Sequence, residues 1–186
     1  MVPPLRVILD AIIARVWFPA LLLPPLLTVL VAVLVVRDPT VFDYAWAERL
    51  GIAIPALTVI VAALCAARSR APFFVWLTAL TANFLTREIH FAGTSASVYV
   101  GLGILLLLAW RGWERLATFL TYPPTITLLG CAFVTYGITI TVDAGWWEFL
   151  PYERTFGTPV EESMELVGHC FLLAAALLPS PPAAEV

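Results

Sequence analysis

The sequence is poor in charge and contains no lysine. Charged residues make up only 12% of the 186 residues, and hydrophobic residues make up 61%, with a mean hydropathy of +0.95. A soluble domain carries roughly 25% charged residues, so this composition excludes an ordinary soluble protein and indicates an integral membrane protein. The net charge of −3 provides no basic surface, which excludes a nucleic-acid-binding protein. The lipid bilayer is the partner that the composition predicts.

Cysteine and histidine are also scarce. The three cysteines (Cys65, Cys131 and Cys170) lie inside apolar runs and form no CxxC pair. They are therefore expected to be small packing residues rather than a disulfide framework. The only histidines are His90 and His169, and no HExxH motif is present. Two histidines are too few for the three-histidine site of ceramidase-like intramembrane hydrolases.

Polar and apolar residues do not alternate as they would in the strands of a membrane barrel, so the apolar runs are expected to be helices. A membrane-spanning helix needs about 20 mainly apolar residues. Four runs reach or nearly reach this length without charge, and two more reach it only by including charged residues at one end. The sequence therefore predicts an all-α bundle of six transmembrane helices in a single domain, 1–186, with spans at about 16–36, 50–67, 71–90, 91–110, 117–142 and 160–179.

The placement of arginine predicts the orientation of this bundle. Residues 4–15 have apolar side chains on one face and are expected to lie along the membrane interface before the first span. Arginines concentrate in this segment and in the two other segments on its side of the membrane, whereas carboxylates dominate the opposite side. The positive-inside rule then places both termini in the cytoplasm. The predicted location is the inner (plasma) membrane of a bacterium, as a multi-pass protein.

Polar side chains recur at three- and four-residue spacing toward the outer ends of three predicted helices. These stripes are Asn83, Arg87 and His90 in 71–90, Tyr136, Thr139 and Asp143 in 117–142, and Glu162, Glu165 and His169 in 160–179. A charge facing lipid at mid-membrane costs roughly 2.5–3.5 kcal/mol, so the stripes are expected to face a common pocket inside the bundle. Arg87 is the expected ion-pair partner of Glu162 or Glu165.

A purely structural interpretation of the same charges is also open. Arg87 and Glu88 would then end their helix at the level of the lipid headgroups. Glu161 would belong to the first turn of the last helix, following Thr158 as its capping residue and Pro159 at its first position. Glu165 and His169 lie beyond that first turn, so capping does not explain them.

The leading functional hypothesis is a metal site. Carboxylates and imidazoles together suit zinc, iron or manganese, and such a metal could activate water to hydrolyse a lipid or an amide. Glu165 and His169 are the predicted functional centre, with Arg87 as the residue that organises the ion pairs. The predicted metal ligands are Glu88, His90, Asp143, Glu162, Glu165 and His169.

Two further functional hypotheses remain. Buried carboxylates with a histidine also suit a proton or cation path, or a pocket for an exported solute. The runner-up hypothesis is a non-catalytic accessory subunit or assembly factor, bound to other membrane subunits of a larger complex. In that case His90 and His169 are candidate axial ligands of a haem or a pigment, although an acidic site is an unusual setting for haem.

The two charged segments together also carry a resemblance. Arg87-Glu88-Ile89-His90 ends one predicted helix, and Glu161-Glu162-Ser163-Met164-Glu165-Leu166 begins a later one. This pair of motifs, RE-x-H and EE-x-x-EL, resembles small bacterial polytopic membrane proteins without a known activity. The resemblance implies that the two motifs belong to one site, and it implies no reaction.

Overall fold

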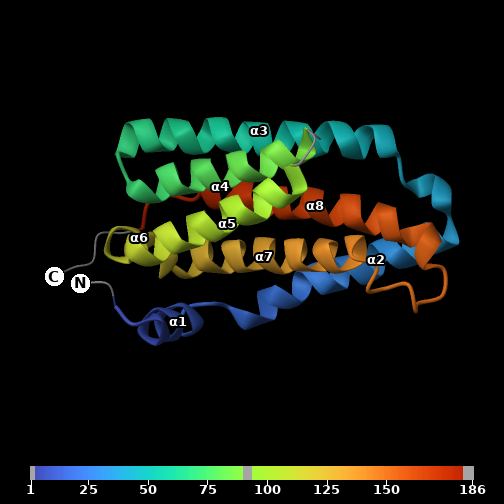
Figure 1. Cartoon of the computed structure of the whole chain (residues 1–186), viewed down its shortest axis with the longest axis horizontal. Helices are drawn as coiled ribbons and strands as arrows, with labels where there is room; N and C mark the ends of the chain where they lie inside the picture. Colours follow the sequence, from blue (N-terminus) through green and yellow to red (C-terminus); the bar gives the residue numbers. More distant parts are fainter. Residues whose placement is uncertain (1–2, 90–93, 182–186) are drawn as a thin grey trace.

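The structure, a computed structural model, describes residues 3–89 and 94–181 (Figure 1). In these residues it contains eight α-helices, two short 3-10 helices (η1 and η2) and no strand, which confirms the predicted all-α class. The elements in chain order are α1 Leu5–Ile13, η1 Phe18–Leu22, α2 Leu23–Arg37, η2 Pro39–Val41, α3 Tyr44–Ser69, α4 Pro72–Glu88, α5 Thr94–Arg111, α6 Trp113–Leu120, α7 Pro123–Asp143 and α8 Glu153–Leu177.

The long helices run side by side along one axis (Figure 1). Helix α8 lies at the centre of this arrangement, because it packs extensively against α7 and α3 and also against α2. Helix α4 packs on α3, and α5 packs on α4. Helix α1 lies across the bundle axis, at the end of the molecule where α8 finishes (Figure 1).

Three helical segments are long and apolar enough to cross a membrane, as the composition predicts. They are Phe18–Arg37, Tyr44–Ser69 and Pro123–Asp143, with mean hydropathies of 2.5, 2.4 and 1.7. A further apolar helical stretch, Ser97–Arg111, is shorter. The chain is therefore a membrane protein by the length and composition of its helices, and the predicted six crossings go beyond these three segments.

Two helices differ in extent from the predicted spans, because a proline and a capping side chain set where they begin. The expected helix 117–142 is divided into α6 and α7, since Tyr122 precedes Pro123 and takes an extended conformation (ψ 117°) that helices avoid. The expected helix 50–67 begins earlier, at Tyr44. There the Asp43 carboxylate accepts hydrogen bonds from the backbone N–H groups of Ala45 (2.9 Å) and Trp46 (3.3 Å).

The last helix also begins earlier than expected. Helix α8 starts at Glu153, so Pro159 lies inside it and Thr158 is not its N-cap. Pro159 costs α8 one backbone hydrogen bond but is buried against neighbouring side chains. The capping-box interpretation is therefore wrong, and Glu161 lies in the third turn of α8 rather than at its beginning.

The outer helix α5 is held to α4 by two polar side chains that reach across. The indole Nε1 of Trp76 donates to the carbonyl of Leu105 (2.9 Å), and Nδ2 of Asn83 donates to the carbonyl of Val98 (3.0 Å). Gly101 faces Asn83 so closely that an added Cβ would collide with its Oδ1. The polar residue Asn83, predicted to face the pocket, thus binds the backbone of α5 instead.

We expect Gly101→Ala to lower the stability of the protein by about 1–3 kcal/mol, the usual cost of overpacking. Its Cβ would push the Asn83 amide away from Val98 and separate α5 from α4. Gly103→Ala is the matched control on the same helix, because an added Cβ meets nothing within 4 Å there. Thermal unfolding in mild detergent measures both. Equal melting temperatures for the two variants would contradict the assigned contact.

Candidate functional site

The candidate site lies where the end of α4 meets one face of α8. Arg87 and Glu88 are the last two residues of α4. Glu161, Glu165 and His169 follow one another at four-residue spacing on α8, so they project from the same face and are separated by about 6 Å along the axis at each step. Two adjacent charges on α4 therefore meet a row of three ionisable side chains.

Arg87 forms the first half of the site. Its Nη2 atom lies 2.5 Å from Oε1 of Glu165 and 3.4 Å from Oε1 of Glu161. The prediction that Arg87 pairs with Glu165 is thus met. Glu165 is 7% exposed, and its Oε1 makes no hydrogen bond of good geometry within the described residues, so its short contact with Arg87 is an ion pair by charge and distance alone.

His169 forms the second half of the site, together with two side chains that bind its ring nitrogens. Its Nε2 lies 3.2 Å from Oε1 of Glu88, and its Nδ1 lies 2.8 Å from the hydroxyl of Tyr136 on α7. His169 is 1% exposed. In the neutral ring with its proton on Nε2, His169 donates to Glu88 and accepts from Tyr136, which gives a continuous Tyr136–His169–Glu88 chain.

Helix geometry explains why Glu88 needs this partner. A carboxylate in the last turn of α4 meets the negative end of the helix dipole, which disfavours its charge. An N–H donor from His169 offsets that cost. Gly51 on α3 makes room for the pair, since a Cβ there would lie 3.2 Å from Oε2 of Glu88.

The aromatic neighbours of His169 are fixed in place as well. The Tyr136 ring stacks on Phe84 of α4, with centroids 4.1 Å apart and planes inclined by 14°. On the other side, Gly168 approaches the same ring, and a Cβ there would lie 2.9 Å from its Cζ atom. The position of the Tyr136 hydroxyl is thus set by packing on both faces of its ring.

Negative charge exceeds positive charge in this site. Glu161 and Glu165 contact the guanidinium of Arg87, and a third glutamate, Glu88, contacts His169, which is neutral unless it gains a proton. Burying an excess of charge of one sign away from water raises the free energy of the folded protein. The site therefore favours the uptake of a proton or another cation.

The structure brings together only part of the predicted site. Glu165 contacts Arg87, and Glu88 contacts His169, as described. Asp143 ends α7 with an exposed side chain that forms no ion pair in the described part of the chain, and Glu162 is half-buried on α8. The predicted ligand His90 lies outside the described residues.

The polar stripe of α7 contributes less than expected. The hydroxyl of Thr139 donates to the backbone carbonyl of Tyr136 (3.0 Å), so it is satisfied within its own helix. Tyr136 is the residue of this stripe that reaches the site, although residue type and spacing did not favour it over Thr139. Glu161 was also missed, because its nearness to Pro159 suggested a helix end.

The predicted metal site is not assembled in the described residues. No group of three or more histidine, cysteine, aspartate or glutamate side chains is placed there to hold a metal ion. The physical reason is visible at His169, whose two ring nitrogens already bind Tyr136 and Glu88. A metal would have to displace one of them.

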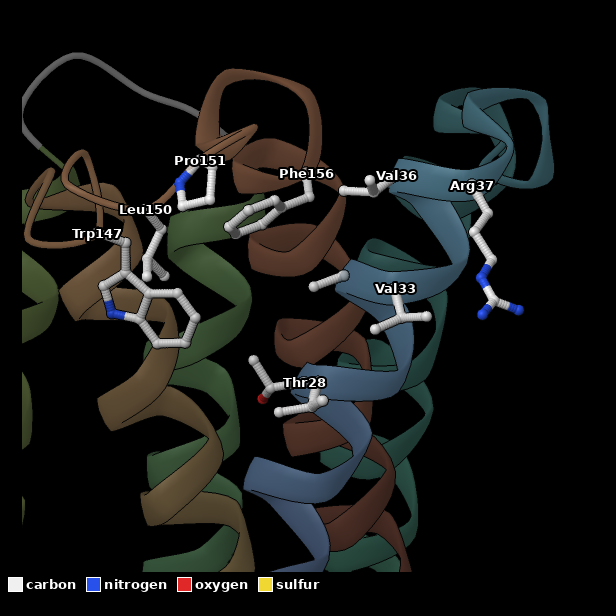
Figure 2. A pocket seen from close by; sticks show the side chains of 10 residues that line it. Thr28, Val33, Val36, Arg37, Trp147, Leu150, Pro151 and Phe156 are labelled. Carbon is white, nitrogen blue, oxygen red and sulfur yellow. The ribbon is translucent and has the colours of Figure 1, made fainter.

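A groove lies away from this site, between α2, the segment that joins α7 to α8 and the beginning of α8 (Figure 2). It has a volume of about 400 Å³, and nearly all of its lining is apolar. Figure 2 shows Trp147, Leu150 and Phe156 opposite Thr28 and Val33, whereas the guanidinium of Arg37 points away from them. The Thr28 hydroxyl donates to the carbonyl of Pro24 (2.9 Å), so the groove presents no reactive group.

Comparison with known proteins finds no match: no protein-family model, no curated protein and no solved structure matches the chain. The resemblance to small bacterial membrane proteins stays a prediction, and the function is argued from the geometry of the site.

We expect Arg87→Ala to destabilise the protein by about 3–5 kcal/mol, because it leaves the buried Glu165 carboxylate without its counter-charge. Glu165→Gln should cost less, since Arg87 retains Glu161. Arg154→Ala, at an exposed position of α8, is the control and should change stability little. Thermal unfolding in mild detergent measures the three variants, and equal losses for all of them would refute the ion-pair cluster.

Gly168→Ala should displace the Tyr136 ring, which Phe84 prevents from moving away freely. We expect a change in the near-ultraviolet spectrum of tyrosine and a loss of about 1–3 kcal/mol of stability. Gly137→Ala is the control, because a Cβ there meets nothing within 4 Å and alanine favours the helix by about 1 kcal/mol. An unchanged tyrosine spectrum in Gly168→Ala would show that the ring is not confined as described.

Proposed function

We propose that this protein is a multi-pass membrane protein whose centre of Arg87, Glu88, Tyr136, Glu161, Glu165 and His169 takes up and releases a proton. The observation that carries the proposal is the Tyr136–His169–Glu88 chain, in which both ring nitrogens of a buried histidine are bound by oxygen. Histidine is the side chain whose ordinary titration lies near neutral pH.

Proton uptake on His169 needs only a local rearrangement of hydrogen bonds. The added proton goes to Nδ1, so that both ring nitrogens donate, and the Tyr136 hydroxyl turns from donor to acceptor. The imidazolium then forms an ion pair with Glu88, and the excess of negative charge around Arg87 falls. No heavy atom has to leave its place in the helix packing.

Release of the proton reverses these changes and restores the unbalanced carboxylates. Because Glu88 belongs to α4, Tyr136 to α7 and His169 to α8, each proton transfer alters contacts between three helices at once. A centre of this kind suits a component of proton-coupled transport, or a subunit that responds to protonation within a larger membrane complex. The six crossings, with both termini in the cytoplasm of a bacterium, form part of this proposal.

Metal binding is the competing proposal, and the excess of carboxylate charge favours it. A zinc, iron or manganese ion held by Glu88, Glu165 and His169 would neutralise the same charges. Such an ion requires His169 to give up Glu88 or Tyr136 as a partner, whereas a proton requires neither. Proton uptake is therefore the function that the observed contacts support better, and haem ligation has no comparable support.

Nitrogen NMR of the protein labelled at histidine tests the proposal. In a His90→Gln background His169 is the only histidine, and its ring should gain one proton as the pH falls. At high pH the proton should lie on Nε2, because Glu88 accepts there and Tyr136 donates to Nδ1. Glu88→Gln should weaken this preference for Nε2, whereas Glu148→Gln, an exposed control, should leave it unchanged.

A ring that keeps one protonation state over the whole pH range of the folded protein would rule out proton uptake at His169. Addition of zinc, iron or manganese to the same sample separates the competing proposal. Stoichiometric metal that shifts the His169 signals and is lost in Glu165→Gln would favour the metal site instead.

A further inference from the structure

A small cavity adjoins the candidate site on the side of α4 that faces α5 and α7. Its volume is about 140 Å³, and its lining includes Phe84, Arg87, Tyr99, Phe133, Tyr136 and Gly137. Two members of the site, Arg87 and Tyr136, therefore form part of its wall. The rest of the lining is mainly aromatic and aliphatic.

Arg87 lines this cavity, and a single one of its nitrogens makes both of its contacts with the glutamates of α8. Both of its contacts with Glu161 and Glu165 use Nη2. The guanidinium has three more N–H groups, on Nη1 and Nε, which these two glutamates do not use. A molecule in the cavity thus meets a cationic donor at one end and aromatic rings around the remainder.

Charge restricts what such a molecule can be. The positive charge of Arg87 is already matched by Glu161 and Glu165, so an anion would add a further negative charge beside them. A cation would be repelled by the positive charge of the guanidinium itself. A neutral molecule with a carbonyl oxygen can accept a hydrogen bond from Arg87 without either penalty.

The exposed part of the cavity wall lies on α5 and α7, which gives the cavity an opening between these two helices. Tyr99 on α5 is 46% exposed, and Ile140 on α7, which also lines the cavity, is 36% exposed. Gly137 lies at this opening with an exposed backbone, and a Cβ there would meet nothing within 4 Å. In a membrane protein a lateral opening between two helices faces lipid, so a ligand that dissolves in lipid has direct access.

We infer that this cavity binds a neutral lipophilic carbonyl compound, with its oxygen on Arg87 and its ring against Phe84, Phe133 and Tyr136. Phe84 and Gly168 already cover the faces of the Tyr136 ring, so a planar ligand ring would meet its edge, and aromatic edge contacts are favourable. The site differs from the proposed proton centre in its ligand and in the face of Arg87 that it uses, and it stands even if His169 does not change its protonation.

Photolabelling with benzophenone, a neutral aromatic ketone, tests this inference on the full chain in lipid nanodiscs. Irradiated benzophenone takes a hydrogen atom from a nearby C–H group, and the two radicals join through a new C–C bond, which leaves an alcohol on the probe. The label should map to peptides that contain Phe133 of α7 or Leu102 of α5. The anionic analogue 4-benzoylbenzoate should label these peptides much less.

Substitutions at two glycines with free space around them, Gly137 and Gly103, provide the decisive comparison. Gly137→Leu should fill the opening and lower labelling by about tenfold, with a smaller loss in Gly137→Ala. Gly103→Leu places the same side chain on α5, where a Cβ also meets nothing within 4 Å, and should label as the unmodified protein does. Unfolding curves of the three variants establish that they are folded.

Equal labelling of the Gly137→Leu and Gly103→Leu proteins would overturn the inference, since it would mean that the probe merely dissolves in the bilayer. Equal labelling by the neutral and anionic probes would overturn the assigned ligand class. Failure of the proton proposal would appear in the NMR signals of His169 and not in these labelling ratios, so the two outcomes remain distinct.

Discussion

A charge that is placed inside an apolar helix bundle must find its counter-charge in the protein, because lipid offers none. In this chain that constraint is met by the contact between the end of α4 and one face of α8. Arg87 pairs with Glu165 and Glu161, and Glu88 pairs with His169 in the next position. These contacts require the end of α4 to lie against the middle of α8.

The packing of the surrounding helices follows from this contact. Helix α8 is covered by α7, α3 and α2, so its ionisable face is withdrawn from the surface. Glycines provide the space where helices approach the polar side chains: Gly51 faces Glu88, and Gly168 faces Tyr136. Phe84 then fixes the Tyr136 ring by stacking, which positions the hydroxyl on Nδ1 of His169. Apolar packing and the polar centre thus determine each other's geometry.

The same arrangement leaves Arg87 between two environments. One side of its guanidinium meets the carboxylates of α8, and the residue also lines a cavity with aromatic walls that opens between α5 and α7. The proton centre and the proposed carbonyl site therefore share one side chain. In the proposed mechanism a proton on His169 lowers the negative charge near Arg87, and that charge affects how strongly Arg87 holds a ligand, which links the two proposals physically.

The sequence by itself determined the all-α class, the membrane-spanning composition of three helices, and the pairing of Arg87 with a carboxylate of the last helix, because hydropathy and charge cost depend on residue type and helical spacing alone. The choice of Glu165 over Glu162 came from the structure. It did not determine where helices begin and end near Pro123 and Pro159, since those boundaries depend on local turns. Only the tertiary structure decided that Tyr136 and Glu88, from different helices, are the two partners of His169, and that Asp143 forms no ion pair in the described part of the chain. Contacts between helices depend on how each helix is rotated about its own axis and how far it is shifted along the bundle. The spacing of residue types in the sequence specifies neither.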